Sequence, residues 1–211
     1  MTNTKKQIKN GEKTTTLQNK QKTELIFILD RSGSMGGLEE ETIKGYNSVI
    51  KNQQKLGGEL SVTTILFDNQ YEKIFDGVSA KDAKLTDKQY FVRGTTALLD
   101  AIGLTLNEVE ARHKKLAKQD RPDKVIVAIT TDGYENASRE YTFPKIKNMI
   151  ENKTANGWEF MFLAANIDEK IVGANLGIKT ENCAGFSANK KGVKDMSARM
   201  CKMMCELRED K

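Results

Sequence analysis

An apolar run that ends in a polar turn constrains the fold of this chain more than any other feature. Leu25-Ile26-Phe27-Ile28-Leu29 has the length and composition of a buried strand, and Asp30-Arg31-Ser32-Gly33-Ser34 follows it directly. Ligands of open α/β sheets bind at the carboxyl ends of the strands. One carboxylate and two hydroxyl groups on such a turn suit a hard cation such as Mg²⁺. The pattern therefore predicts a ligand site directly after a buried strand.

Strand-like and helix-like segments alternate along the rest of the chain. The predicted strands span residues 24–30, 59–67, 71–78, 124–131, 158–164 and about 180–186, and the predicted helices span about 38–56, 97–116, 141–155, 168–175 and 189–207. Only Asp68-Asn69-Gln70 separates the second strand from the third, so this pair is antiparallel, because a parallel crossover needs a dozen residues or more. The order predicts a Rossmann-like, doubly wound α/β fold whose mostly parallel sheet has one antiparallel edge strand and helices on both faces.

The excess positive charge lies at the start of the chain. Of 34 Lys and Arg and 29 Asp and Glu, six Lys and one Glu fall in residues 1–22, so the remainder carries 28 charges of each sign. We expect residues 1–22 to be a disordered, polar, basic tail and residues 23–211 to form a single domain that includes a C-terminal helix. A neutral folded part with one Trp makes nucleic acid an unexpected partner, and the tail is either a solubilising leader or a weak contact for an acidic partner.

Cysteine usage and hydropathy indicate a soluble, cytoplasmic protein. The chain has three cysteines, Cys183, Cys201 and Cys205, and an odd number argues against a disulfide framework. Cys201 and Cys205 have a spacing that could hold a metal, but no His or second Cys pair accompanies them, so buried or half-buried free thiols are favoured. No apolar run is long enough to span a bilayer, and the N-terminal residues lack the apolar region of a secretory signal.

Three oxygen-rich loops follow strand-associated positions. They contain Asp30, Ser32 and Ser34; then Gly94-Thr95-Thr96; and then Thr131-Asp132-Gly133. If strands 24–30 and 124–131 are neighbours, Asp30 and Asp132 lie side by side at their carboxyl ends. Two carboxylates that close repel each other unless a cation lies between them, and hydroxyl groups can complete its ligand shell. The three loops together predict a Mg²⁺ site.

These elements resemble the metal-ion-dependent adhesion site (MIDAS) of von Willebrand factor type A (vWA) domains. The resemblance covers about residues 23–186 and is closer to the bacterial and phage cytoplasmic members than to the secreted ones, which carry signal peptides and disulfides. It implies an intact MIDAS in which Asp30, Ser32, Ser34, Thr96 and Asp132 hold a divalent cation, Mg²⁺ or alternatively Mn²⁺ or Ca²⁺. It also implies a protein partner that offers an Asp or Glu carboxylate to the metal. A membrane partner is not expected, because no apolar run is long enough to span a bilayer.

Two adjacent residues, Thr95 and Thr96, are candidates for the threonine ligand. The family register, in which a small-residue helix start follows the threonine, favours Thr96, and Thr95 would then support the turn. A second alternative concerns the first loop. Asp30, Ser32 and Ser34 on their own are equally typical of turn and helix-cap chemistry.

A metal-dependent hydrolase, phosphatase-like or nuclease-like, is the main alternative function for the same residues. Aspartyl-phosphate phosphatases need Asp two positions after the first Asp, where this chain has Ser32. The chain has no G-x-S-x-G elbow, no Walker-type loop and no G-x-G-x-x-G. Its only histidine, His113, lies in a charged helical stretch, where we expect a solvated side chain. We therefore predict a binding module rather than an enzyme.

Two helices carry apolar stripes. In the helix over 38–56, the expected inner face comprises Leu38, Thr42, Gly45, Tyr46, Val49 and Leu56. In the C-terminal helix, Val193, Met196, Met200, Met203 and Leu207 follow helical spacing. We expect this second stripe to pack on the sheet as core, with an exposed interaction helix as the alternative.

Overall fold

The computed structural model describes residues 21–209, so the predicted basic tail lies outside the described residues except at positions 21 and 22. Lys22 begins the first strand, and its N–H donates to Asp123 Oδ2 at 2.8 Å. Regular structure therefore starts at the end of the predicted tail, two residues earlier than the strand predicted over 24–30.

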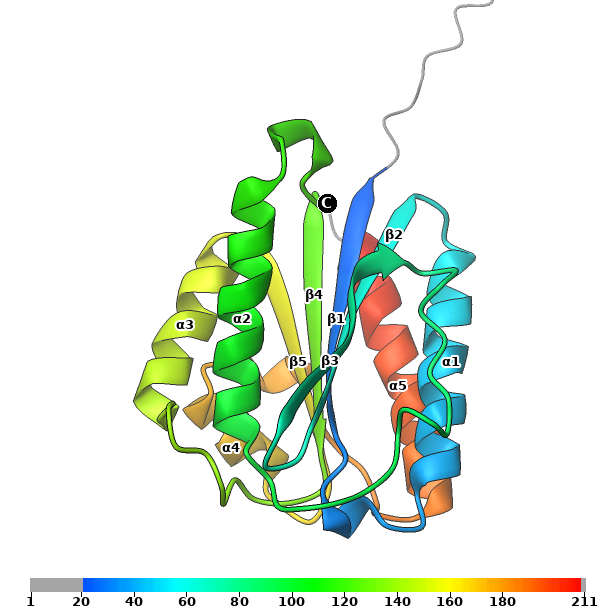
Figure 1. Ribbon diagram of the computed structural model, residues 1–211, viewed down its shortest axis with the longest axis vertical. Coiled ribbons are helices and arrows are strands. Elements are labelled where there is room, and N and C mark those ends of the chain that lie inside the picture. The colour runs from blue at the N-terminus through cyan, green and yellow to red at the C-terminus, as the bar shows by residue number, and fades with distance from the viewer. Residues whose placement is uncertain (1–20, 210–211) are drawn as a thin grey trace, which may run out of the picture.

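Six strands form one sheet (Figure 1). They are β1 (Lys22–Asp30), β2 (Glu59–Phe67), β3 (Tyr71–Ser79), β4 (Lys124–Thr131), β5 (Trp158–Ala164) and β6 (Cys183–Gly185). Their order across the sheet is β3-β2-β1-β4-β5-β6, and every neighbouring pair is parallel except β2 and β3. The predicted mostly parallel sheet with one antiparallel edge strand is confirmed.

Helices cover both faces of this sheet, as predicted (Figure 1). They are α1 (Glu39–Gln54), α2 (Leu98–Lys115), α3 (Phe143–Ala155), α4 (Glu169–Asn175) and α5 (Lys190–Glu209). One core lies between the sheet and the pair α1 and α5, and the other lies between the sheet and α2, α3 and α4. No helix within residues 21–209 combines the length and apolar character needed to cross a membrane.

The central position of β1 explains its unbroken apolar run. Leu25, Phe27 and Leu29 point into the core under α1 and α5, while Ile26 and Ile28 point into the core under α2 and α3. Successive side chains of a strand point to opposite faces, so a strand covered on both faces is apolar at every position. The parallel pairing with β4 runs from Thr23 opposite Lys124 to Leu29 opposite Thr130, which aligns the ends of the two strands.

Two predicted details differ from the structure. Leu56 is 45% exposed, because α1 ends at Gln54 and the chain leaves the helix before it reaches the predicted inner face. The last strand is shorter than predicted, since residues 180–182 form a 3-10 turn and only Cys183–Gly185 pair with β5. Cys183 is buried and Cys201 and Cys205 are half-buried free thiols, as predicted.

The C-terminal helix packs as core, but its inner face is slightly rotated from the predicted one. Val193, Met196 and Met200 are buried as expected. The next buried methionine is Met204, whereas Met203 is only partly buried at the edge of the core. A spacing of four residues from Met200 keeps this face directed at the sheet, because four residues complete slightly more than one helical turn.

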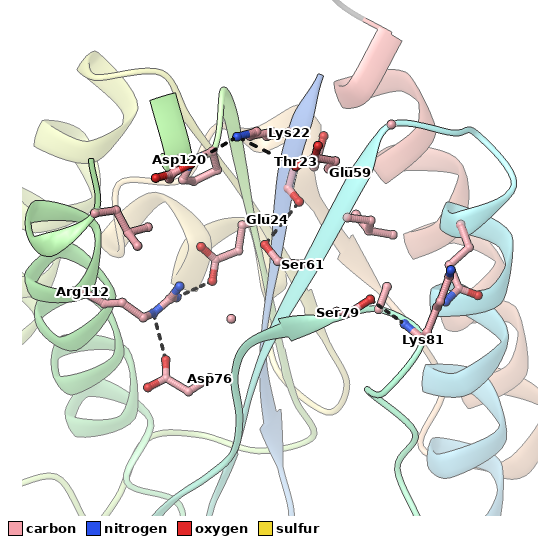
Figure 2. Close-up of a pocket in the computed structure, with 17 residues that line it drawn as sticks. Lys22, Thr23, Glu24, Glu59, Ser61, Asp76, Ser79, Lys81, Arg112 and Asp120 are labelled. Carbon is pink, nitrogen blue, oxygen red and sulfur yellow. Dashed lines mark hydrogen bonds and ion pairs between the residues drawn. The ribbon is translucent and has the colours of Figure 1, made fainter. Parts of the chain in front are cut away.

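A cavity of about 790 Å³ lies at the edge of the sheet where β1 begins (Figure 2). Arg112 of α2 reaches toward Glu24 of β1 and Asp76 of β3. His113 Nε2 lies 2.6 Å from Glu24 Oε2, and the His113 side chain is only 13% exposed. The prediction of a solvated His113 was therefore wrong, because α2 packs its last turns against a buried carboxylate that is distant in sequence.

Glu24 provides a pH-dependent contribution to stability. Burial raises the pKa of this carboxyl, but hydrogen bonds from His113 and Thr63 and the charge of Arg112 outweigh burial, so its pKa lies below the ordinary value of 4.5. A lowered pKa in the folded state stabilises the protein above the pKa of the unfolded chain. That stabilisation is lost as the pH falls through the folded-state pKa.

We predict that Met204→Ala lowers the free energy of unfolding by ~2–5 kcal/mol, because it leaves a cavity in a fully buried position. Met203→Ala, one residue away and only partly buried, should cost less than about 1 kcal/mol. Urea denaturation of both variants measures the difference. Equal losses would contradict the orientation of α5.

We predict that Glu24→Gln lowers stability by ~1.5–3 kcal/mol at neutral pH, because it removes the charged acceptor of a buried hydrogen-bond network. The deficit relative to the wild type should begin to shrink as the pH falls below 4.5, where the unfolded carboxyl takes up a proton, and should vanish below the lower pKa of the folded state. Denaturation at a series of pH values tests this. Glu59→Gln, an exposed residue of the same cavity, is the matched control and should show neither effect.

Candidate metal centre

The pairing of β1 with β4 brings two carboxylates to the same edge of the sheet. Asp30 is the last residue of β1, and Asp132 directly follows the last residue of β4. Thr131 Oγ1 donates a hydrogen bond to Asp30 Oδ2 at 2.6 Å, which joins the two strand ends directly. Both aspartates are almost fully buried. The parallel register, rather than any local motif, places the predicted aspartates side by side.

The first loop brings its two serines to the same place. Ser32 N donates to Asp30 Oδ1 at 2.7 Å, so the turn closes on the carboxylate. Ser32 Oγ and Ser34 Oγ are 3.1 Å apart, and Ser34 Oγ donates to Asp132 Oδ1 at 2.5 Å. Asp30, Ser32, Ser34 and Asp132 are therefore joined by one run of hydrogen bonds across both loops, which starts at the backbone N–H of Ser32 and continues through the two serine hydroxyls.

The loop with the two threonines borders this run of hydrogen bonds. Gly33 N donates to Gly94 O at 3.2 Å, and Gly94 has a φ of +66°, which disfavours a side chain there. Thr96 is buried, and its N–H donates to Asn136 Oδ1 at 2.9 Å, whereas Thr95 is exposed. Thr96 thus lies between the first loop and the loop after Asp132.

The two carboxyl groups both have raised pKa values. Burial raises the pKa of Asp30 to about 6, against hydrogen bonds from Thr131 and Ser32 that lower it, and the charge of Asp132 raises it further. Burial likewise raises the pKa of Asp132, although the hydrogen bond from Ser34 opposes this. Two buried carboxylates without a basic partner are costly to ionise, and a bound cation removes that cost.

The donor set fits a hard divalent cation. Asp132 Oδ2 is buried, and no hydrogen-bond donor among the described residues reaches it. The nearby ligand atoms are carboxylate and hydroxyl oxygens, which suit Mg²⁺, Mn²⁺ or Ca²⁺ better than thiolate-binding metals. Within residues 21–209, no group of three or more His, Cys, Asp and Glu side chains is placed to hold a metal. A site here therefore depends on the serine and threonine hydroxyls.

Several residues that shape the site were not singled out from the sequence. Tyr90 is buried, and its hydroxyl donates to Asp30 O at 2.6 Å. Glu135 accepts from the N–H groups of Leu99, Ala137 and Ser138, which fixes the loop after Asp132 to the start of α2. The contacts between Tyr90 and Asp30 and between Leu99 and Glu135 join segments that are distant in sequence, so no local sequence pattern indicates them.

A buried ion pair links the first loop, the turn after β2 and the threonine loop to one another. The side chains of Arg31 and Asp68 are both fully buried, with Arg31 Nε 3.1 Å from Asp68 Oδ2. Arg93 Nε lies 2.7 Å from the same oxygen, and Arg31 Nη2 also pairs with Glu72. Asp68 O accepts the N–H of Ala97. Arg31, the first variable residue of the D-x-S-x-S turn, thereby connects the first loop to the turn after β2 and, through Asp68, to the threonine loop.

No protein-family model matches the sequence, and no curated protein matches it either. Solved structures do match. Proximal thread matrix protein 1 from the mussel byssus has a TM-score of 0.66 and 16% identity over 88% of this chain, which spans about half (47%) of that chain. The vWF domain of the pilus tip protein Mfa5 from Porphyromonas gingivalis has a TM-score of 0.63 and 9% identity over 89% of this chain and 96% of that chain.

Two of the similar structures hold a metal. One form of the mussel protein has a zinc-occupied MIDAS motif. The manganese-loaded TRAP protein of Plasmodium vivax has a TM-score of 0.58 and 17% identity over 84% of this chain and 72% of that chain. Identities this low show the fold alone. The chain has the α/β fold of vWA domains, with helices on both faces of a mostly parallel sheet.

Proposed function

We propose that this chain is a divalent-cation-dependent protein-interaction module of the vWA type. The observation that carries the proposal is the run of hydrogen bonds that joins Asp30, Ser32, Ser34 and Asp132, together with the buried Asp132 Oδ2, which no donor among the described residues reaches. The metal-holding proteins of the same fold support a cation at this edge of the sheet.

In this proposal Asp30, Ser32, Ser34, Thr96 and Asp132 hold the cation, and it is Mg²⁺, or alternatively Mn²⁺ or Ca²⁺, because every ligand atom is oxygen. Bound there, the cation supplies a positive charge that a partner protein's Asp or Glu carboxylate can neutralise. The protein holds its two aspartates in place with Thr131 and Ser34, which fixes the direction from which a partner approaches. Ser34 is exposed, so the site opens to solvent on its side.

Binding is favoured over catalysis by the position of the one histidine. His113 lies beside Glu24, six residues before Asp30 on the same strand, which corresponds to roughly 20 Å. It therefore cannot act as an acid or base at the metal site. A metal-dependent hydrolase is the alternative function, and phosphatase and nuclease assays with Mg²⁺ or Mn²⁺ test it directly.

We also propose a cytoplasmic location and an origin among the bacterial or phage members of the fold. The location rests on the three cysteines, which are all free thiols and suit a reducing compartment. The similar structures include pilins and a pilus adhesin, so a measurement of where the protein resides in its cell is the relevant test.

We predict that Asp132→Ala abolishes Mg²⁺ binding and leaves the fold intact, because the side chain lies at the sheet edge rather than in either apolar core. Asp30→Ala should also abolish binding. Isothermal titration with Mg²⁺ and circular dichroism of each variant provide the measurements. Asp87→Ala changes an exposed aspartate outside the site and is the control. An unchanged Mg²⁺ affinity in the Asp30 or Asp132 variant would refute the site.

We predict that the full chain captures its partner only with a divalent cation present. Proteins retained from a lysate of its source organism with Mg²⁺ should be released by EDTA, and the Asp30→Ala protein should not retain them. Quantitative mass spectrometry of the two eluates measures the difference. A partner retained equally with Mg²⁺ and with EDTA would exclude an interface bridged by the metal.

A further inference from the structure

Two of the four large apolar side chains exposed among residues 21–209 lie on loops that border the candidate metal site. The four are Leu56 (45% exposed), Phe91 (44%), Tyr134 (62%) and Ile171 (60%). Phe91 and Tyr134 belong to loops that contact the metal-site residues, whereas Leu56 follows the end of α1 and Ile171 lies in α4. Exposed aromatic side chains beside a ligand site are typical of protein-binding surfaces.

Phe91 belongs to a segment that crosses the first metal-site loop. Its neighbour Tyr90 points inward and donates to Asp30 O, and Arg93 N donates to Arg31 O at 2.9 Å. Phe91 itself points outward. Its ring centre lies 5.4 Å from the Arg31 guanidinium carbon and 5.3 Å from that of Arg93. Two cations at this distance hold the ring in one orientation.

The two guanidinium groups are themselves immobilised. Both pair with Asp68 Oδ2, and Arg93 Nη2 also donates to Gln70 Oε1 at 2.9 Å. The Arg31 side chain is fully buried. Phe91 is therefore an exposed ring on a rigid base. When a partner contacts it, the Phe91 side chain loses little conformational entropy.

Tyr134 belongs to a different loop, the one after β4, and lies two residues after Asp132. A side chain at the intervening Gly133 would come within 3.9 Å of Ser34 Oγ, so this loop passes directly beside the serine of the site. The loop is held by Asn166 Nδ2, which donates to Asp132 O at 3.1 Å, and by the hydrogen bonds that Glu135 accepts. Tyr134 is thus exposed on a loop that is fixed at both ends.

We propose that Phe91 and Tyr134 bind apolar side chains that flank the partner's metal-binding acidic residue. The inference rests on the proposed function and specifies the partner: an Asp or Glu with large apolar neighbours. Apolar contacts around a charged pair exclude water, and the attraction between carboxylate and cation increases as water is excluded. The metal then selects the acidic group, and the two aromatic rings select its neighbours.

Three fluorescein-labelled peptides test the proposal in the presence of Mg²⁺. The first has a central Asp between leucines, the second has the same Asp between glycines, and the third has Asn between leucines. Fluorescence anisotropy should show the leucine-flanked Asp peptide binding about tenfold more tightly than the glycine-flanked one. The double variant Phe91→Ala/Tyr134→Ala should bind both Asp peptides equally, with Mg²⁺ affinity unchanged by isothermal titration.

Leu56→Ala/Ile171→Ala is the matched control, since it removes the two exposed apolar side chains that lie elsewhere, and it should retain the tenfold preference. Equal affinity of the two Asp peptides for the wild type, or a preference that survives in the Phe91/Tyr134 variant, would overturn this inference alone. Equal binding of the Asp and Asn peptides would instead overturn the proposed function. Dimerisation in analytical ultracentrifugation that the Phe91/Tyr134 variant abolishes would replace the acidic partner by a second copy of the chain.

Discussion

The hydrogen bond from Thr131 to Asp30 joins the two central strands where both end, and the candidate site depends on this junction. It is possible only because β1 and β4 are parallel neighbours in register. A shift of one residue would turn every side chain of a strand to the opposite face and would separate the carboxylates. Both strands are apolar on both faces, so the two cores that bury them also fix the geometry of the site.

The same junction concentrates negative charge in a buried place. Asp30 and Asp132 lie together with hydroxyl donors but without a basic side chain that pairs with either of them among the described ion pairs. Elsewhere the chain pairs its buried charges closely, as Glu24 with Arg112 and Asp68 with Arg31. Since an unpaired buried carboxylate costs free energy, this contrast favours a ligand site over a structural network.

Much of the fold was predictable because its signals are local. Unbroken apolar runs identified β1 and β4, and the short turn before Tyr71 identified the antiparallel pair. The motif residues were also recognisable, because each polar turn directly follows an apolar run or opens a helix in the sequence. The contact between His113 and Glu24 was not predictable, because it depends on how α2 lies across β1. The burial of Met204 rather than Met203 depends on how α5 is rotated about its axis. Helical spacing after Met200 allows either residue to face the core, so the sequence does not distinguish them.

The Arg31 position shows why a motif describes only part of a site. In the D-x-S-x-S pattern this residue is variable, yet its side chain is fully buried and pairs with Asp68 from the turn after β2. Through Asp68 O and the N–H of Ala97, the same turn holds the threonine loop, and through the ring of Phe91 it supports an exposed aromatic surface. One buried ion pair therefore connects the loops around the candidate metal site with the surface proposed to select a partner. A partner that binds there meets a preformed surface, and its affinity depends mainly on its own contacts.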